Sequence, residues 1–337
     1  MTHGEPFPRR VWPLPRIETV ALRDVRESRP VALYTSGPAW DALRGDLDLP
    51  VVWRNEPADA SENLFNSLAE SIPAAAGVIY AVGGGLPVDA AKIAMARRGL
   101  PLVAVPTALS VDAHLTPASG IRRDGCVFYL ETGAPERLLI DWEVLAAAPA
   151  WVRAAGLGDV LSIATGLWDW RYAEDQDRNI PGQRWTPYVA DSARILLDEG
   201  IRIAASAGRG EREGLAGLLQ LLALEVQLCS LIGHSRPEEG SEHAFAYSVE
   251  NLTGHGLPHG DLVGPGIVAL AAAQGQDVGQ LRDALAAAGA RLDRIPREFA
   301  ETTLRGLPAY VARHGLPFSL ANTLDEQQID RALGSLW

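Results

Sequence analysis

The feature that most constrains the fold is an apolar run that ends in three glycines and leads straight into a helical pattern. Residues 77–85 read GVIYAVGGG, which predicts a buried strand. A helix is predicted over 87–98, with Pro87 at an early helical position, where its missing N–H costs little. The apolar run PLVAVPT at 101–107 predicts the next strand. A strand, a helix and a strand with short connections indicate two parallel strands joined by a right-handed crossover.

Other short apolar runs extend this pattern through the first half of the chain. The expected strands are VALYTS at 31–36, PVVW at 50–53 and LLID at 138–141. The runs SGIRR and CVFYLE flank Asp124 and Gly125, a pair typical of a tight hairpin turn. The first half is therefore predicted to be an α/β Rossmann-like domain with a parallel sheet, residues 1–150.

Strand runs disappear after about residue 150, and helical periodicity rich in Ala and Leu continues to the end. We expect helices at 187–207, 211–233, 241–251, 262–274, 277–288 and 296–314, and a short helix near the C-terminus. The second half is therefore predicted to be an all-α domain over residues 151–337, which completes a dehydroquinate synthase-like fold in two domains.

Charge and cysteine usage exclude several classes of protein. The formal net charge is −12, and an acidic chain without a basic cluster is not expected to bind nucleic acid. Cys126 and Cys229 are the only cysteines, which excludes a disulfide scaffold and a cysteine-based metal cage. Lys92 is the only lysine among 30 basic residues, which indicates a position where arginine is not equivalent.

No targeting or membrane segment is expected. The N-terminal residues MTHGEPFPRR lack the apolar core of a signal peptide. The most apolar helical pattern, residues 214–233, is interrupted by Gln220, Glu225, Gln227 and Ser230. We interpret it as a buried helix that is too polar to span a bilayer. The chain is therefore expected to be soluble and cytoplasmic, with no membrane partner.

The triglycine turn is a candidate phosphate-binding site. Gly83, Gly84 and Gly85 lie between a strand and a helix, where the backbone can approach a phosphate and the helix offers free N–H groups. The pattern is not GxGxxG, because Val88 and Asp89 occupy the later positions. A tight turn without a ligand is the alternative interpretation.

Three residues of the second half form a candidate metal site. Asp159, His243 and His259 supply one carboxylate and two imidazoles, a donor set suited to a borderline-soft divalent cation. Three protein ligands leave one position open, as in catalytic zinc sites. Taken singly, Asp159 could be a helix cap, and each histidine could be a structural residue.

Longer strings carry a family resemblance. The string GGGLPVDAAK resembles the GGGSxxDxAK signature of the superfamily of iron-containing alcohol dehydrogenases, glycerol dehydrogenases and dehydroquinate synthases. VPTALSVDAHLTPASGI, GLGDVLSIATGLWDW, GSEHAFAYSVE and LPHGDLVGPGIVAL follow in the family's order, over roughly residues 80 to 268. These strings are most similar to those of the sn-glycerol-1-phosphate dehydrogenase group.

The resemblance implies a metal-dependent oxidoreductase that transfers hydride between NAD or NADP and a polyol or alcohol, in the cleft between the two domains. It implies Asp159, His243 and His259 as the metal ligands. Iron-type relatives carry a further His where this chain has Ile163, so the expected metal is Zn²⁺, with Fe²⁺ or Ni²⁺ as alternatives. The expected substrate is a small polyol, alcohol or ketone, and the expected assembly is a homo-oligomer, a dimer or larger.

The resemblance also implies roles around the cofactor. Gly83, Gly84 and Gly85 are expected to line the pyrophosphate. The other expected cofactor contacts are Asp89, Thr107, Ser110 and Ser36. The expected catalytic residues are Lys92, Asp112 near the substrate hydroxyls, and His255 as a proton acceptor. The first strand ends in Thr35-Ser36-Gly37, without the Asp that NAD-preferring relatives carry there, so NADP is allowed.

Two departures from the family pattern leave the substrate open. Ile163 stands where the glycerol-1-phosphate branch has Lys, and Tyr247 stands where relatives often have another His. An unphosphorylated or larger polyol is therefore an alternative substrate. A dehydroquinate-synthase-like cyclase is a second hypothesis, against which Asp159 and the single Lys92 argue. A catalytically altered, nucleotide-binding descendant is the third.

Overall fold

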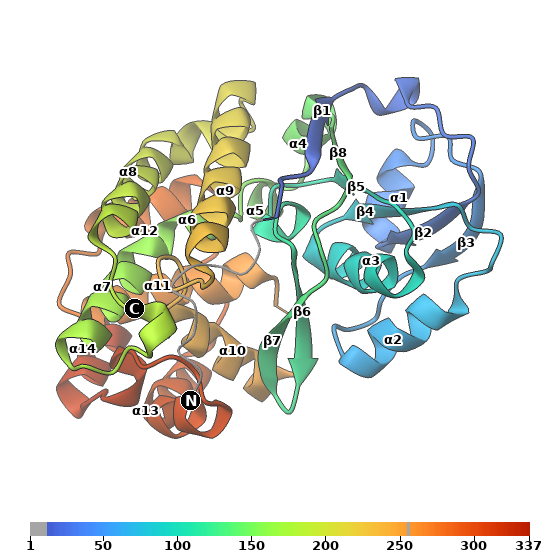
Figure 1. Ribbon diagram of the computed structural model, residues 1–337. Helices are drawn as coiled ribbons and strands as arrows, with labels where there is room; N and C mark the ends of the chain where they lie inside the picture. The colour runs from blue at the N-terminus through green and yellow to red at the C-terminus, as the bar shows by residue number, and fades with distance from the viewer. Residues whose placement is uncertain (1–11, 255–256) are drawn as a thin grey trace. The chain divides into compact units, whose positions relative to one another are not determined.

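The computed structural model describes residues 12–254 and 257–337, which form two compact units (Figure 1). Residues 12–149 make up an α/β unit, and residues 150–337 make up a helical unit. The expected fold class, a parallel-sheet domain followed by an all-helical one, is confirmed.

The α/β unit is built on a six-stranded parallel sheet with the order β1-β8-β5-β4-β2-β3. Its strands are β1 Arg16–Thr19, β2 Val31–Thr35, β3 Val51–Asn55, β4 Val78–Gly83, β5 Leu102–Pro106 and β8 Arg137–Ile140. The central strands β2 and β4 are buried along their whole length, which explains their uninterrupted apolar runs. The edge strand β1 is mostly exposed, so it lacks the apolar run that predicted the others.

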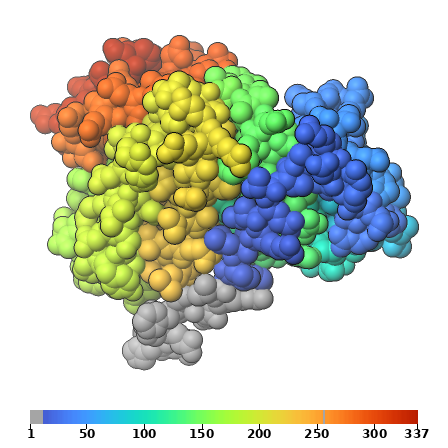
Figure 2. Space-filling model, turned by 90° about the horizontal axis from the view of Figure 1, so that it is seen from above, coloured from blue at the N-terminus to red at the C-terminus, as the bar shows by residue number. Residues whose placement is uncertain are grey.

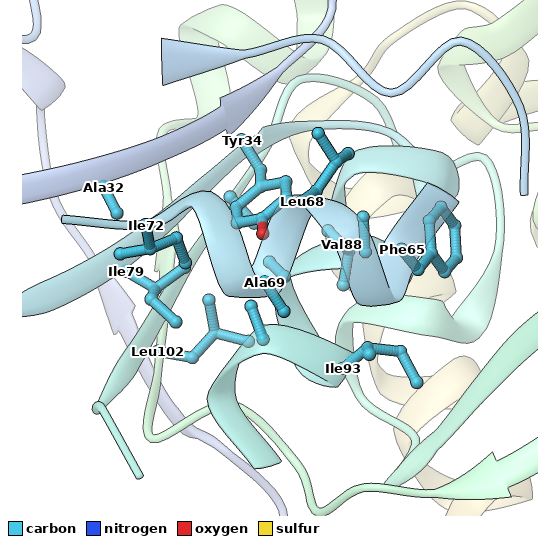
Figure 3. Close-up of a cluster of buried hydrophobic side chains, with 14 of the residues drawn as sticks. Ala32, Tyr34, Phe65, Leu68, Ala69, Ile72, Ile79, Val88, Ile93 and Leu102 are labelled. Atoms are coloured by element: carbon cyan, nitrogen blue, oxygen red, sulfur yellow. The ribbon is translucent and has the colours of Figure 1, made fainter. Parts of the chain in front are cut away.

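Helices cover the sheet and pack against its apolar residues. They are α1 Gly37–Leu43, α2 Glu62–Ser71, α3 Gly85–Arg98 and α4 Trp142–Ala147. Figure 3 shows Phe65 and Leu68 of α2, Val88 of α3, and Tyr34 and Ile79 of the sheet within one core cluster. This packing holds α3 and the turn that precedes it against the centre of the sheet.

The strand order has a switch point between β2 and β4. The chain leaves β2 for β3 on one side, whereas it leaves β4 for β5 on the other side. Connections that diverge between two neighbouring strands mark the place where open α/β sheets bind their ligands. The turns after β2 and β4 are therefore the expected ligand-binding turns.

The predicted hairpin is confirmed as a separate two-stranded sheet, with β6 Ala118–Arg123 paired to β7 Cys126–Glu131. Asp124 and Gly125 have φ values of 53° and 77°. Positive φ at both central residues is what a type I′ turn requires, which accounts for the Asp-Gly pair. A 3-10 helix, η2 Asp112–His114, connects β5 to this hairpin.

The helical unit contains no strand within the described part of residues 150–337. Its helices are α5 Ala150–Arg153, α6 Leu157–Leu161, α7 Ile163–Asp175, α8 Pro187–Gly208, α9 Arg212–Ile232, α10 Ser241–Thr253, α11 His259–Ala273, α12 Gly279–Ala287, α13 Arg297–His314 and α14 Glu326–Leu336. The six longer helices predicted from periodicity are present, with ends that differ by no more than a few residues. The turn η4 Leu320–Asn322 precedes α14.

Among the described helices, α9 alone is long and apolar enough to cross a membrane by length and composition. The mean hydropathy of its most apolar window is 1.9, so the expectation that this segment is too polar for a bilayer is wrong. Half of that window is buried inside the structure, and core helices of soluble proteins pass the same test. Atoms of this part of the chain, coloured yellow, also lie on the surface in Figure 2. Composition alone therefore gives only weak evidence for a membrane span.

Candidate metal centre and nucleotide-binding turn

Three side chains of the helical unit converge on one point. Asp159, His243 and His259 each offer a ligand atom, and these atoms lie within 4.8 Å of one another. His259 Nε2 is 3.0 Å from Asp159 Oδ1, and the rings of His243 and His259 are 5.5 Å apart between centroids. The structure thus brings together the three residues that the sequence analysis assigned to the metal.

Each of these three candidate ligands comes from a different helix. Asp159 belongs to the short helix α6, His243 to the first turn of α10, and His259 begins α11. The helices α10 and α11 pack closely, because a side chain at Gly266 would place its Cβ 2.8 Å from the Glu242 carbonyl oxygen. Close packing of these helices holds the ligands of α10 and α11 near one another.

The donor set fits a divalent metal. Asp159 Oδ2 is buried and has no hydrogen-bond partner among the described residues. An unpaired carboxylate oxygen is costly in a protein interior unless a cation balances it. One carboxylate and two imidazoles match the ligand types of catalytic zinc sites, in which ligand atoms lie about 2.0–2.2 Å from the metal.

Glu242 orients one of the two imidazoles. Its Oε1 lies 2.8 Å from His243 Nδ1 and also accepts a hydrogen bond of 2.7 Å from the Gly240 N–H. A hydrogen bond at Nδ1 leaves Nε2 as the atom that faces the centre, a common arrangement for metal-binding histidines. Glu242 is fully buried, so this contact is shielded from water.

The negative charge around His243 is strong. Burial lowers the pKa of His243, but the hydrogen bond and charge of Glu242, with the charges of Glu239 and Asp159, outweigh it and raise the pKa to about 9. The same potential that favours a proton on this imidazole favours a cation beside it. Sequence reasoning missed Glu242, although it directly precedes His243.

Replacing Glu242 by Gln is expected to weaken metal binding by about 10- to 100-fold. The amide keeps the size of the side chain but removes the charge that holds His243 in its ligand orientation. Competition with a chromogenic chelator measures the affinity for Zn²⁺ directly. The matched control is Glu298→Gln, which removes a charge from the exposed first turn of α13. Equal affinities in the two variants would contradict the orienting role.

Asp169 ties the elements behind the metal centre together. Its Oδ2 accepts hydrogen bonds from the Ser241 N–H and Oγ, at 2.7 and 2.6 Å, and its Oδ1 accepts one of 2.7 Å from the Leu320 N–H. A side chain at Gly240 would place its Cβ 2.6 Å from Asp169 Oδ2 and 2.9 Å from Glu242 Oε2, so only glycine fits there. Burial and the charge of Glu242 raise the pKa of Asp169 to about 6.

The structure shows what surrounds Tyr247 and Ile163, the two residues that depart from the family pattern. Tyr247 is buried one turn after His243, its ring centroid is 5.9 Å from that of His243, and its hydroxyl donates to Glu239 at 2.5 Å. Ile163 is buried at the start of α7. Arg236 is buried and donates to the carbonyls of Asp169 and Phe318. Its guanidinium is thus engaged in holding the fold.

The glycine turn of the α/β unit ends β4 and begins α3. Gly83 has a φ of +140°, which side chains rarely tolerate, and a Cβ there would lie 3.1 Å from Pro87 Cγ. Cβ atoms at Gly84 and Gly85 would lie 3.3 Å from Ser110 Oγ and 3.0 Å from Val111 Cγ2. The turn is therefore a bare-backbone cradle before a 14-residue helix, and it fits a pyrophosphate.

Other predicted cofactor contacts lie around this turn. Ser36 Oγ is 3.6 Å from the position that a Cβ on Gly83 would take, and Ser110 borders Gly84. The Thr107 N–H donates to the Gly83 carbonyl over a long 3.4 Å. The structure thus gathers Ser36, Thr107 and Ser110 at the carboxyl edge of the sheet. Their contact with a cofactor remains a prediction.

The Lys92 side chain is buried and contacts three oxygen atoms. Its Nζ lies 3.1 Å from Asp89 Oδ1 and donates to the carbonyls of Thr116 and Ala118. Three acceptors converging on one point suit the three N–H groups of an ammonium better than the planar fork of arginine. Burial raises the pKa of Asp89, and the charges of Lys92 and Arg122 oppose that shift. Through these bonds Lys92 joins α3 to the segment that enters β6, and its catalytic role remains a prediction.

The residues after β5 support the glycine turn from the other side. Asp112 begins η2, and its carbonyl accepts the Leu115 N–H at 2.7 Å. His114 is buried, and its Nε2 lies 3.0 Å from the Gly83 carbonyl oxygen. Burial lowers the pKa of His114 to about 4, so the ring is neutral and donates its Nε2 proton to that carbonyl. The catalytic role of Asp112 near the substrate remains a prediction. His255 lies outside the described residues.

His114 makes the stability of the protein depend on pH. Its pKa is about 4 in the folded state and 6.5 in an unfolded chain, so the unfolded state takes up a proton first as the pH falls. The contribution of His114 to the free energy of unfolding is fully present above pH 6.5. It is lost as the pH falls from 6.5 to 4, by up to about 3 kcal/mol. We expect His114→Gln, which keeps a donor for Gly83, to flatten this part of the profile. Urea titrations of both proteins at several pH values measure the difference, and parallel profiles would contradict the assignment.

Comparison with known proteins agrees with this geometry. Residues 43–149 match the family model described as "Iron-containing alcohol dehydrogenase". A glycerol-1-phosphate dehydrogenase [NAD(P)+] of Thermofilum pendens is 34% identical over 285 residues, which cover 80% of this chain and 78% of that protein. The protein of the same name from Aeropyrum pernix is 32% identical over 267 residues, 77% of this chain and 74% of that one.

Solved structures share the fold at lower identity. The crystal structure of a probable glycerol dehydrogenase from Sinorhizobium meliloti matches with a TM-score of 0.70 and 18% identity, over 97% of this chain and 98% of that one. This likeness shows the fold alone, whereas the sequence relatives show the family. On this evidence, the chain belongs to the superfamily of iron-containing alcohol dehydrogenases and has the glycerol-1-phosphate dehydrogenases among its relatives.

Proposed function

We propose that this protein is a metal-dependent dehydrogenase that transfers hydride between NAD(P) and a small polyol or alcohol, or the corresponding ketone. The observation that carries the proposal is the convergence of Asp159, His243 and His259, with a buried carboxylate oxygen of Asp159 that has no hydrogen-bond donor among the described residues. The relatives named above, which are NAD(P)-linked by their names, support the same reaction class.

In this proposal some residues of the chain bind the metal or the cofactor, and others position those residues. Asp159, His243 and His259 would hold the metal, which as a Lewis acid lowers the pKa of an alcohol hydroxyl. The nicotinamide supplies the hydride chemistry. Glu242 keeps His243 in its ligand orientation, and Gly83, Gly84 and Gly85 offer bare backbone to the pyrophosphate. We propose Zn²⁺ as the metal, because one carboxylate and two imidazoles form a borderline-soft donor set.

Elemental analysis of the purified protein, followed by a substrate panel, tests the proposal. The panel contains glycerol, other diols, their ketones and glycerol-1-phosphate, each with NAD and with NADP, and nicotinamide absorbance reports turnover. We expect about one divalent metal per chain and turnover with at least one polyol or ketone. A protein that holds metal but transfers no hydride would refute the proposed activity. Light scattering tests the homo-oligomer that belongs to the same proposal, and cell fractionation tests the cytoplasmic location.

A nucleotide-binding protein without turnover is the second candidate. Tyr247 is held by Glu239 beside His243, and Ile163 is apolar and buried, so two polar groups expected near the metal are replaced. Tight nucleotide binding, with no turnover on any member of the panel, would favour this candidate. The cyclase alternative has no observation in the structure that favours it.

A further inference from the structure

The turn after β2 lies next to a carboxylate from the neighbouring strand. A side chain at Gly37 would place its Cβ 3.2 Å from Glu56 Oε2. Glu56 directly follows β3, which pairs with β2 at the edge of the sheet. The sequence analysis found no acidic residue at the end of the strand that is now β2, and the tertiary structure supplies one from the neighbouring strand β3.

The two residues that follow β2, Ser36 and Gly37, lie between the glycine turn and Glu56. Ser36 Oγ lies 3.6 Å from the Cβ position of Gly83, and the next residue, Gly37, borders Glu56. A dinucleotide whose pyrophosphate rests on the turn after β4 can therefore extend its adenosine over Gly37 towards Glu56. This is also the edge of the sheet where the connections after β2 and β4 lead in opposite directions, as the strand order requires.

The place of Glu56 in the sheet agrees with the general chemistry of such folds. In doubly wound sheets that bind NAD, the pyrophosphate rests on a glycine-bearing turn, and an acidic residue accepts hydrogen bonds from the adenosine ribose. In this chain the glycine turn follows β4, and Glu56 precedes that turn in the sequence and directly follows β3, so the usual sequence spacing does not apply. What agrees is an acidic side chain at the carboxyl edge of the same sheet, beside the turn after β2.

The local chemistry leaves one oxygen of Glu56 for a ligand. Arg54 Nη2 donates to Glu56 Oε1 at 3.0 Å, while Oε2 is the atom nearest to Gly37. Pro57 is buried and restricts the preceding residue to extended backbone, which limits where the Glu56 side chain can move. About two fifths of the Glu56 side chain is exposed, so a ligand can reach it.

We propose that Glu56 binds the 2′- and 3′-hydroxyls of the adenosine ribose and makes the protein select NAD over NADP. A carboxylate accepts hydrogen bonds from two vicinal hydroxyls, whereas it repels the 2′-phosphate of NADP. The inference rests on the proposed nucleotide-linked function and narrows its cofactor to NAD. It reverses the expectation from Thr35-Ser36-Gly37 alone, which left NADP allowed.

Binding measurements test this selection without reference to turnover. Isothermal titration of the metal-loaded protein with NAD⁺ and NADP⁺ gives two dissociation constants. We expect the wild type to bind NAD⁺ at least about 30-fold more tightly. Glu56→Gln keeps hydrogen bonding but removes the charge, so it is expected to narrow that ratio by about tenfold or more, mainly through tighter NADP⁺ binding.

Three further variants sharpen the test. Glu70→Gln on α2 removes an exposed charge of the same unit and is the matched control, with an unchanged ratio expected. Glu56→Ala frees Arg54 to meet a 2′-phosphate and is expected to favour NADP⁺ further. The double variant Glu56→Ala/Arg54→Gln is expected to lose the tighter NADP⁺ binding of Glu56→Ala. All of these residues are on the surface, and thermal melts confirm that each variant is folded.

The outcomes separate the inference from the function on which it rests. Equal or tighter binding of NADP⁺ by the wild type would overturn the inference and leave the proposed dehydrogenase standing. An unchanged ratio in Glu56→Gln would overturn it as well. Failure of the wild type to bind either nucleotide would reject the proposed function, and the inference with it. Tighter binding of NAD⁺ than of NADP⁺ by the wild type, with a much smaller difference in Glu56→Gln, would establish Glu56 as the residue that selects NAD.

Discussion

His259→Ala is expected to empty the metal centre, abolish hydride transfer and leave the fold intact. Loss of one of three ligands leaves Asp159 and His243, and we expect the affinity for the metal to fall by at least about 100-fold, more than the loss of a supporting contact causes. The side chain of His259 is 29% exposed, so its removal creates little buried cavity and little loss of stability. Elemental analysis after dialysis and circular dichroism measure the two effects separately.

His314→Ala is the matched control, because His314 ends α13 and is not one of the three ligands. It should retain metal and activity. Full metal occupancy with unchanged activity in His259→Ala would place the metal elsewhere in the protein and would contradict the assigned centre. A protein that keeps its metal and loses only activity would show that His259 acts on the substrate instead.

Asp169→Ala is expected to lower the free energy of unfolding by about 3–5 kcal/mol. The carboxylate accepts three buried hydrogen bonds, two from Ser241 and one from the Leu320 N–H, and its loss leaves these donors unsatisfied. Because Ser241 begins α10 and Leu320 begins η4, the variant also loosens the start of the helix that carries His243. Urea unfolding with the metal removed measures the stability apart from metal binding.

Asp169→Asn tests the hydrogen-bond acceptors of the side chain without changing its size. The amide retains one acceptor oxygen and presents an N–H₂ group to a backbone or hydroxyl donor, so an intermediate loss of stability is expected. A loss below about 1 kcal/mol in Asp169→Ala would mean that water replaces the carboxylate, and would contradict its structural role.

Local patterns were sufficient to predict most of the elements and to name three candidate metal ligands. The apolar runs of β4 and β5 and the glycines between β4 and α3 are signals read over a few residues, and the structure confirms these elements. The edge strand β1 and the helices α1 and α2 were not predicted. For β1 the reason is physical, since an edge strand that is mostly exposed needs no apolar run.

Contacts between distant residues account for what the sequence analysis missed. Glu242 and Asp169 belong to strings already noted for their family resemblance, yet nothing local shows that both carboxylates meet at Gly240. The signal that could have revealed Asp169 is an acidic residue on the apolar side of a helix, between Trp168 and Trp170. For His114 no such signal exists, because its partner is a backbone carbonyl 31 residues away.

By itself, the sequence indicated most of the strands and helices, a phosphate-type turn and three candidate metal ligands, because periodicity, glycine placement and ligand chemistry are properties of short segments. Only the tertiary structure decided which side chains meet. Strand pairing brings Glu56 to Gly37, and helix packing brings Asp169 to Ser241 and Glu242. Such contacts depend on the packing of whole elements, which no short segment encodes, and the selection of NAD that we propose for Glu56 depends on one of them.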